Sequence, residues 1–114
     1  MPGFSQPRLE GTWTGTLDQN VGSSGYNMVL TLTQQSGQSD YPGLNCGGTW
    51  TRVGAMGEYI FFVERITRGR VDQGGRCLDG TFTVAPAGGS LAVNWFSSYR
   101  GKPHVGWALL RPKR

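Results

Sequence analysis

This 114-residue chain contains two cysteines and a single histidine, side chains that can take part in catalysis. A thiol at Cys46, partnered by His104 and oriented through Asp40 or Asn45, could act as a nucleophile. Cys46 and Cys77 lack metal-ligand spacing, but they could pair across neighbouring strands in an oxidising compartment. Nothing in the sequence places Cys46 beside His104, and no helix start is available to favour the thiolate. We therefore expect a disulfide, or a small buried side chain, rather than a catalytic thiol.

Two carboxylates, Glu58 and Glu64, lie six residues apart on a predicted strand and so share one face of it. Paired carboxylates can perform acid–base chemistry. More often, such residues are charges at a barrel mouth or partners of nearby arginines. Because Glu64 follows the apolar run 60–63, it could also be a buried, partnered carboxylate inside a barrel. In that position it would indicate a ligand site.

Basic residues are concentrated in a hairpin over residues 65–76 and in a later loop. They comprise Arg65, Arg68, Arg70, Arg76, Arg100 and Lys102. With aromatic side chains nearby, this set could bind an anion, a nucleotide or single-stranded nucleic acid by charge and stacking. The alternative is a solvated basic loop balanced by Asp72 and Asp79. Glycine fingerprints for phosphate or dinucleotide binding are absent, because the glycines sit in turns with no helix following.

The elements that must position these residues are predicted to be strands. Apolar and polar residues alternate with a period of two, most clearly at Met28, Leu30 and Leu32. No segment has helical periodicity, and residues 35–44 are predicted to form a polar loop. The last strand places Val105, Trp107 and Leu109 on one face. The predicted strands cover residues 11–19, 26–34, 45–53, 58–67, 77–85, 91–96 and 104–111, with a possible short strand in 68–76.

This pattern predicts an all-β protein, a single antiparallel up-and-down barrel of seven to eight strands. A closed or nearly closed barrel is favoured over a sandwich, because short turns join consecutive strands and many of the 19 glycines fall where strands must bend. Residues 1–10 carry two prolines and are expected to be a flexible N-terminal lead-in. Residues 11–114 are expected to form the single barrel domain.

The first strand begins with Gly11-Thr12-Trp13, which resembles the Gly-x-Trp signature of the calycins. That superfamily holds lipocalins, avidin-like proteins and small bacterial lipocalin-like inhibitors. The resemblance covers this tripeptide and the rhythm of the strands. It implies a barrel in which a basic side chain of the last strand packs over Trp13, with Arg111 as the first candidate and Arg100 as the second. The chain is shorter than a typical lipocalin, lacks that family's terminal helix, and carries no polar set typical of a biotin site.

The bulk composition sets further expectations. A net charge of +4 is a mild bias toward anionic partners or toward solubility. No apolar run is long enough to span a bilayer, and residues 1–8 have no apolar core typical of a signal peptide. We expect a cytoplasmic protein if residues 1–114 are the native chain, and a secreted or periplasmic one if they are a mature domain. A monomer or weak dimer is expected, with no cofactor and no metal site.

The function predicted from these features is that of a non-enzymatic binding module. A small molecule or a protein segment would bind at one open end of the barrel, where aromatic, acidic and basic side chains gather. One alternative is binding of an anion, a nucleotide or nucleic acid by the 65–76 hairpin. Another is an inhibitor or accessory domain with a solid barrel. The predicted ligand-binding residues are Tyr41, Trp50, Glu64, Arg65, Trp95 and Tyr99.

Overall fold

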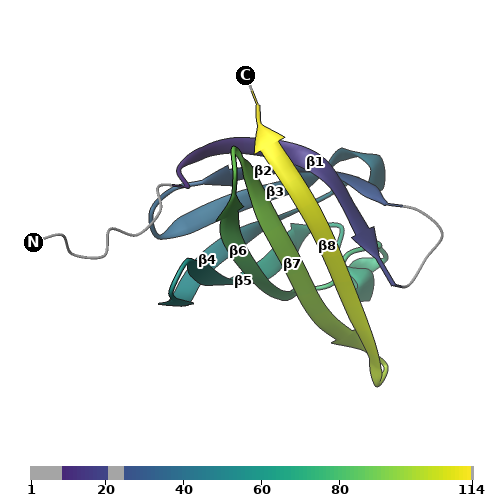
Figure 1. Cartoon of the computed structure of the whole chain (residues 1–114). Coiled ribbons are helices and arrows are strands. Elements are labelled where there is room, and N and C mark those ends of the chain that lie inside the picture. Colours follow the sequence, from purple (N-terminus) through teal and green to yellow (C-terminus); the bar gives the residue numbers. More distant parts are fainter. Residues whose placement is uncertain (1–8, 21–24, 114) are drawn as a thin grey trace, which may run out of the picture.

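The computed structural model describes residues 9–20 and 25–113, which form a closed barrel of eight antiparallel strands (Figure 1). Each strand pairs with the next one in the chain, and β1 pairs with β8 to close the barrel. The all-β, up-and-down barrel predicted from the sequence is therefore confirmed, with eight strands. The strands are β1 (Gly11–Gln19), β2 (Tyr26–Leu32), β3 (Ser36–Tyr41), β4 (Cys46–Met56), β5 (Tyr59–Arg68), β6 (Gly80–Ala87), β7 (Ser90–Tyr99) and β8 (Lys102–Pro112).

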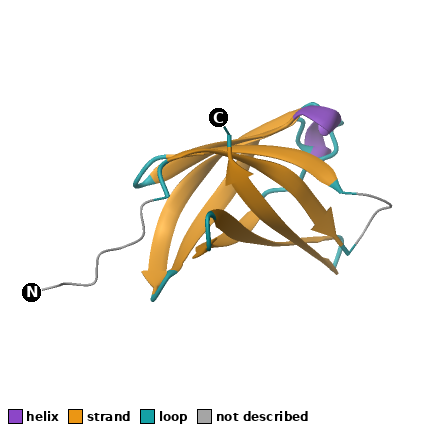
Figure 2. Cartoon of the chain, turned by 45° about the horizontal axis from the view of Figure 1, so that its top comes forward, coloured by secondary structure: helices purple, strands orange, loops and turns teal. Residues whose placement is uncertain are grey.

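Two short 3-10 turns complete the structure. They are η1 (Pro42–Leu44) and η2 (Val71–Gln73), and they lie together at one corner of the barrel (Figure 2). The disulfide between Cys46 and Cys77 joins the segments that follow them. Within the described part of the chain, no helix is long and apolar enough to cross a membrane.

A layer of aromatic side chains fills the middle of the barrel. Trp50 on β4 stacks on Phe82 of β6 with ring centroids 4.1 Å apart, and it meets Phe62 of β5 at 5.3 Å. All three side chains are almost fully buried. Aliphatic side chains from inward positions of several strands, β5 and β6 included, pack beyond this layer, toward the end that holds Trp13. They include Leu30, Leu32, Ile60, Val84, Leu91, Val93 and Leu110.

Strand β3 corrects the sequence prediction, which assigned residues 35–44 to a polar loop. The inward positions of β3 are Gly37, Ser39 and Tyr41, so the strand has almost no apolar alternation. Gly37 is small because its neighbours fill the space: a Cβ there would lie 2.8 Å from Leu32 Cδ2 and 3.3 Å from Trp50 Cβ. The segment is a strand because both neighbouring strands pair with it, although its composition is typical of a loop.

Strand β8 has two large apolar residues on the outside. Trp107 and Leu109 are 45% and 60% exposed, whereas Ala108 and Leu110 are buried. Two inward positions of this strand, Gly106 and Ala108, are small. At Gly106 the space is already taken, because a Cβ there would lie 3.1 Å from Trp95 Cε3. The predicted grouping of Val105 with Trp107 and Leu109 is therefore on the outer surface.

Trp13 is fixed by the chain just before it. Its indole Nε1 donates to the carbonyl oxygen of Leu9 at 2.9 Å, and Leu9 itself is buried. Residues 1–8 of the predicted lead-in lie outside the described residues. The expectation that a basic residue covers Trp13 is wrong for both candidates. Arg111 pairs with Thr14 and is exposed on the outer face, next to buried Leu110, while Arg100 lies 5.2 Å over the ring of Tyr99.

Candidate functional site

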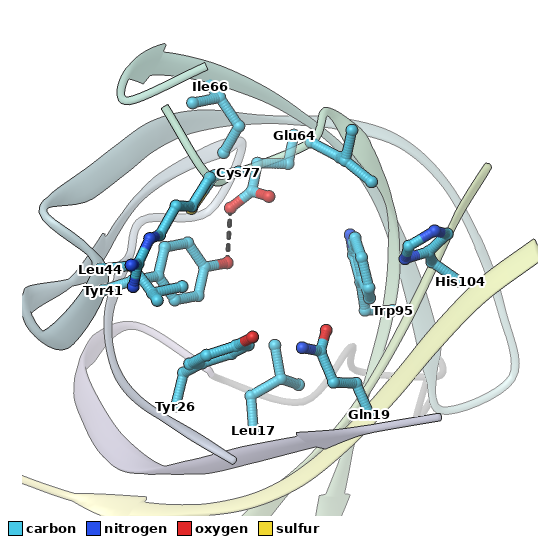
Figure 3. A pocket seen from close by; sticks show the side chains of 12 residues that line it. Leu17, Gln19, Tyr26, Tyr41, Leu44, Glu64, Ile66, Cys77, Trp95 and His104 are labelled. Atoms are coloured by element: carbon cyan, nitrogen blue, oxygen red, sulfur yellow. Dashed lines mark hydrogen bonds between the residues drawn. The ribbon is translucent and has the colours of Figure 1, made fainter. Parts of the chain in front are cut away.

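A pocket opens at the end of the barrel opposite Trp13, with a volume of about 190 Å³ (Figure 3). It lies where β1, β3, β5 and β7 end and where β2 and β8 begin. Tyr41, Tyr26, Trp95 and His104 supply ring-bearing walls, and Leu17, Leu44, Ile66 and Leu78 supply aliphatic ones. Gln19, Cys77, Glu64 and Arg76 complete the lining.

Glu64 lies in the wall of this pocket and is only 2% exposed. Three donors converge on one of its carboxylate oxygens, Oε2. They are the Ser39 hydroxyl at 2.6 Å, the Tyr41 hydroxyl at 2.7 Å and the Trp50 indole N–H at 2.9 Å. The two hydroxyl distances are as short as those of charge-assisted hydrogen bonds to an ionised carboxylate. The geometry is therefore that of a buried, hydrogen-bonded carboxylate.

The second oxygen of Glu64 is placed differently. Oε1 accepts no hydrogen bond from any described residue and faces the open centre of the pocket (Figure 3). In the described part of the chain, every side-chain nitrogen or oxygen that is sealed from solvent has a hydrogen-bond partner. Oε1 is therefore reached from the cavity, and it is available to a bound molecule.

Strand register explains how three donors from two strands meet at the carboxylate of Glu64 on a third. Glu64 is inward because it alternates with Phe62 and Ile66 on β5, and Trp50 pairs with it from β4. Ser39 and Tyr41 occupy successive inward positions of β3, on the other side of β4. The close approach of β4 and β5 requires a glycine on β4. A Cβ on Gly48 would lie 2.6 Å from the Arg65 carbonyl oxygen.

Burial raises the pKa of Glu64 above its ordinary value, because the charged form loses water. The hydrogen bonds from Ser39, Tyr41 and Trp50 act in the opposite direction, and the charge of Asp79 adds a smaller upward contribution. Burial also raises the pKa of Tyr41 well above its ordinary value, and the Glu64 charge adds to that effect. The phenol of Tyr41 is thus held protonated, as a donor to Glu64.

Three of the six predicted ligand-binding residues, Tyr41, Glu64 and Trp95, line the pocket. Trp50 does not line it but lies beneath, where it donates to Glu64. Arg65 is on the outer face of β5. Tyr99 lies on the β7–β8 hairpin, which projects beyond the rest of the barrel, and its ring meets the edge of His104 (Figure 1).

Several residues of the site, which line the pocket or donate to Glu64 beside it, were not among the predicted ligand-binding residues. Ser39 was missed because its segment was predicted to be a loop, although Gly37, Ser39 and Tyr41 do follow a two-residue period. Gln19 and Tyr26 flank residues 20–25 and meet at the mouth because Leu17 pairs with Tyr26. His104 was considered only as a partner of a catalytic thiol.

The basic residues of the alternative anion site are spread over several environments. Arg68 pairs with Asp40 at 2.6 Å. Arg70 contacts Asp72 at 3.0 Å and Asp79 at 2.7 Å. Arg76 borders the pocket, Arg65 and Lys102 are exposed, and Arg100 covers Tyr99. Asp72 and Asp79 thus neutralise Arg70, as in the solvated-loop alternative, and Asp40 of β3 neutralises Arg68.

The other proposed chemical groupings are separated in the structure. Cys46 and Cys77 are joined by a disulfide, so neither sulfur is a free thiol. Glu58 lies in the exposed turn before β5, whereas Glu64 is buried inside the barrel. Six residues of strand span about 20 Å, so the two carboxylates cannot act on one substrate atom. Among the described residues, no group of three or more His, Cys, Asp or Glu side chains could hold a metal ion.

Comparisons with known proteins leave the site to be interpreted from its own geometry. The chain matches no protein-family model, no curated protein and no solved structure.

Proposed function

We propose that this protein is a non-enzymatic binding module that holds a small molecule in the open end of its barrel. The observation that carries the proposal is the pocket beside Glu64, which combines a cavity with an inward carboxylate oxygen that accepts no hydrogen bond from the described residues. Binding sites for small molecules are typically concave and mostly apolar, with a few polar groups that fix the ligand's orientation. The lining of this pocket has that composition.

The size of the pocket limits the ligand. Its volume of about 190 Å³ is below the range of drug-sized sites, but it exceeds the roughly 150 Å³ cavity that is known to hold benzene. A ligand of one ring with a short substituent fits this space. A larger molecule would have to extend out of the mouth, past His104 and Arg76.

Two further observations agree with this proposal. The closed eight-stranded barrel is compatible with the calycin-like fold implied by the resemblance around Trp13, and binding at one barrel end suits that fold. The disulfide supports an oxidising setting, and hence a secreted or periplasmic protein, because such bonds are rare where thiols are kept reduced.

A ligand screen by NMR tests the proposal. Single-ring compounds of differing charge are added to isotope-labelled protein, and the indole N–H of Trp95 and the amide of Gln19 report on the pocket. We expect compounds that bind to shift these two signals while the indole N–H of Trp13, at the far end, stays unchanged. Shifts confined to exposed loops, or absent throughout, would contradict the proposal.

A variant that fills the cavity supplies the control. Leu17→Phe adds a larger side chain at the pocket wall, whereas Thr16→Phe adds the same ring on the outer face of the same strand. Overpacking costs about 1–3 kcal/mol of stability, so the folded state must be checked by circular dichroism. Leu17→Phe should abolish binding, and Thr16→Phe should leave it intact.

A further inference from the structure

The buried carboxylate of Glu64 has no cationic partner within the described residues. Their three ion pairs join Arg68 with Asp40 and Arg70 with Asp72 and Asp79. Buried charges in proteins are normally paired, because removing an ion from water is costly. Three neutral donors stabilise Oε2 but supply no positive charge. No ion pair within this part of the chain supplies a positive charge to Glu64, so a cation bound in the pocket could supply it.

The geometry of the carboxylate specifies where that charge would lie. Oε2 is fully occupied by the donors from Ser39, Tyr41 and Trp50. Oε1 is turned into the cavity (Figure 3). A cation that entered the pocket would meet this oxygen directly, and the fixed Oε2 would keep the carboxylate from rotating away. The site is therefore preorganised for one contact at one oxygen.

The walls around Oε1 suit the same kind of ligand. Tyr26, Tyr41 and Trp95 surround the pocket. Aromatic faces attract cations, and they also pack well against another ring. Aliphatic side chains of Leu17 and Ile66 supply the remaining apolar surface. A ring with a short cationic arm would satisfy both the aromatic walls and the carboxylate.

We propose that the ligand of this pocket is a small organic monocation, a protonated primary amine carried on a single aromatic ring, whose ammonium group binds Oε1 of Glu64. This inference rests on the proposed function and specifies its ligand class. The ring lies against Trp95 and Tyr26, within the available volume of about 190 Å³.

Other charged groups at the pocket favour a single positive charge on the ligand. Arg76 borders the cavity and would repel a second cationic group placed toward the mouth. His104 also borders it and would repel the ligand when protonated. Asp79 acts on Glu64 at longer range and hydrogen-bonds the Ile66 amide through Oδ1. The expected ligand is therefore a monocation, not a diamine.

Three probes of one shape and different charge test the inference. Benzylammonium, benzyl alcohol and benzoate are titrated separately into the purified protein, and the NMR signals of Trp95 and Gln19 are followed. We expect benzylammonium to bind with a dissociation constant between about 10 µM and about 1 mM. Benzyl alcohol should bind at least about tenfold more weakly, and benzoate weaker still.

Two isosteric variants locate the charge that selects the cation. Glu64→Gln removes the negative charge while preserving shape, and it should weaken benzylammonium binding by about tenfold or more. Glu58→Gln removes a carboxylate from the exposed turn before the same strand and should have no effect. Equal binding of benzylammonium and benzyl alcohol, or unchanged affinity in Glu64→Gln, would overturn the ligand class but leave the pocket as a binding site. No shift with any probe up to about 10 mM would overturn both.

A measurement on the unmodified protein keeps the test valid if Glu64→Gln does not fold. Calorimetric titrations with benzylammonium are run from about pH 4.5 to about pH 7.5. Affinity should fall as the solution becomes acidic and Glu64 gains a proton, and the fall should persist in a His104→Gln variant. Affinity independent of pH, or pH dependence that disappears with His104, would overturn the inference.

Discussion

The two halves of the barrel interior differ in what their inward positions carry. Toward the Trp13 end, Trp50, Phe62 and Phe82 pack against one another and are followed by buried aliphatic side chains. Toward the His104 end, apolar side chains such as Ile66 and Trp95 lie beside polar ones such as Glu64 around a cavity of about 190 Å³. The same eight strands therefore provide a packed core at one end and an accessible chamber at the other.

Glu64 lies at the boundary between these halves. Its Oε2 is tied to Trp50, which belongs to the packed layer, and its Oε1 faces the chamber. The packed half supplies burial energy and fixes the strand ends, which lets the other half keep an opening and an incompletely paired charge. A small barrel can bear this cost only because its apolar packing is concentrated elsewhere.

The largest expected effect comes from emptying the packed half. Phe82→Ala should lower the free energy of unfolding by about 3–5 kcal/mol, because it removes the ring stacked on Trp50 and leaves a void. Leu78 is a half-buried residue of the pocket wall. Leu78→Ala should lower the free energy of unfolding by about 1 kcal/mol, because the leucine side chain already borders empty space. Urea denaturation of both variants measures the difference. Equal losses would mean that the two halves are packed alike.

Removal of the disulfide should come next in size. The bond closes a separation of 31 residues and joins segments at the pocket end. Replacing both cysteines by serine should cost about 2–4 kcal/mol, since the unfolded chain regains conformational freedom. Amide exchange would show where the protein loosens. We expect amide exchange to accelerate more around Leu44 and Leu78 than around Leu30 or Val84. An equal acceleration throughout the barrel would contradict the difference between its two halves.

The boundary carboxylate should make stability depend on pH. Burial raises the pKa of Glu64 in the folded protein, so the folded protein holds the Glu64 proton more tightly than the unfolded chain does. The stability that protonated Glu64 contributes is fully present below the pKa of the unfolded chain and is lost as pH rises through the pKa of the folded protein. The loss is about 1.4 kcal/mol for each pH unit by which the two pKa values differ. Urea unfolding at a series of pH values should therefore show Glu64→Gln gaining stability relative to the unmodified protein as pH rises. Parallel pH profiles would be contrary to this account.

The smallest effect is expected on the outer wall, which belongs to neither half. Leu109 is 60% exposed, so Leu109→Ala should change the free energy of unfolding by no more than about 0.5 kcal/mol. The neighbouring Leu110 is fully buried, and Leu110→Ala should cost about 2–5 kcal/mol. Thermal unfolding compares the two variants. A reversed order would show that the faces of β8 are assigned incorrectly.

Sequence pattern predicted those strands whose inward side chains are apolar. Met28, Leu30 and Leu32 on β2 and Leu91 and Val93 on β7 alternate as expected, and all five are buried. The pattern failed where long-range neighbours occupy the interior. Strand β3 is built around Gly37 and Ser39 because Leu32, Trp50 and Glu64 take up the space. Leu32 lies on the neighbouring β2, whereas Trp50 and Glu64 come from β4 and β5.

The candidate site was only partly predictable for the same reason. An apolar run ending in Glu64 indicated a buried carboxylate, but its donors Ser39 and Tyr41 come from an unrecognised strand. Arg65 was expected at the mouth together with Glu64, yet successive residues of a strand point to opposite faces. Only the register of β3, β4 and β5 decides which side chains reach that carboxylate.

A crystal structure of the protein soaked with benzylammonium tests the central claim most directly. We predict electron density for one ring in the open half, with the nitrogen within about 2.7–2.9 Å of Glu64 Oε1 and the packed half unchanged. A chamber filled by collapse of Trp95 or Tyr26, or a probe bound only on the outer wall, would contradict the account.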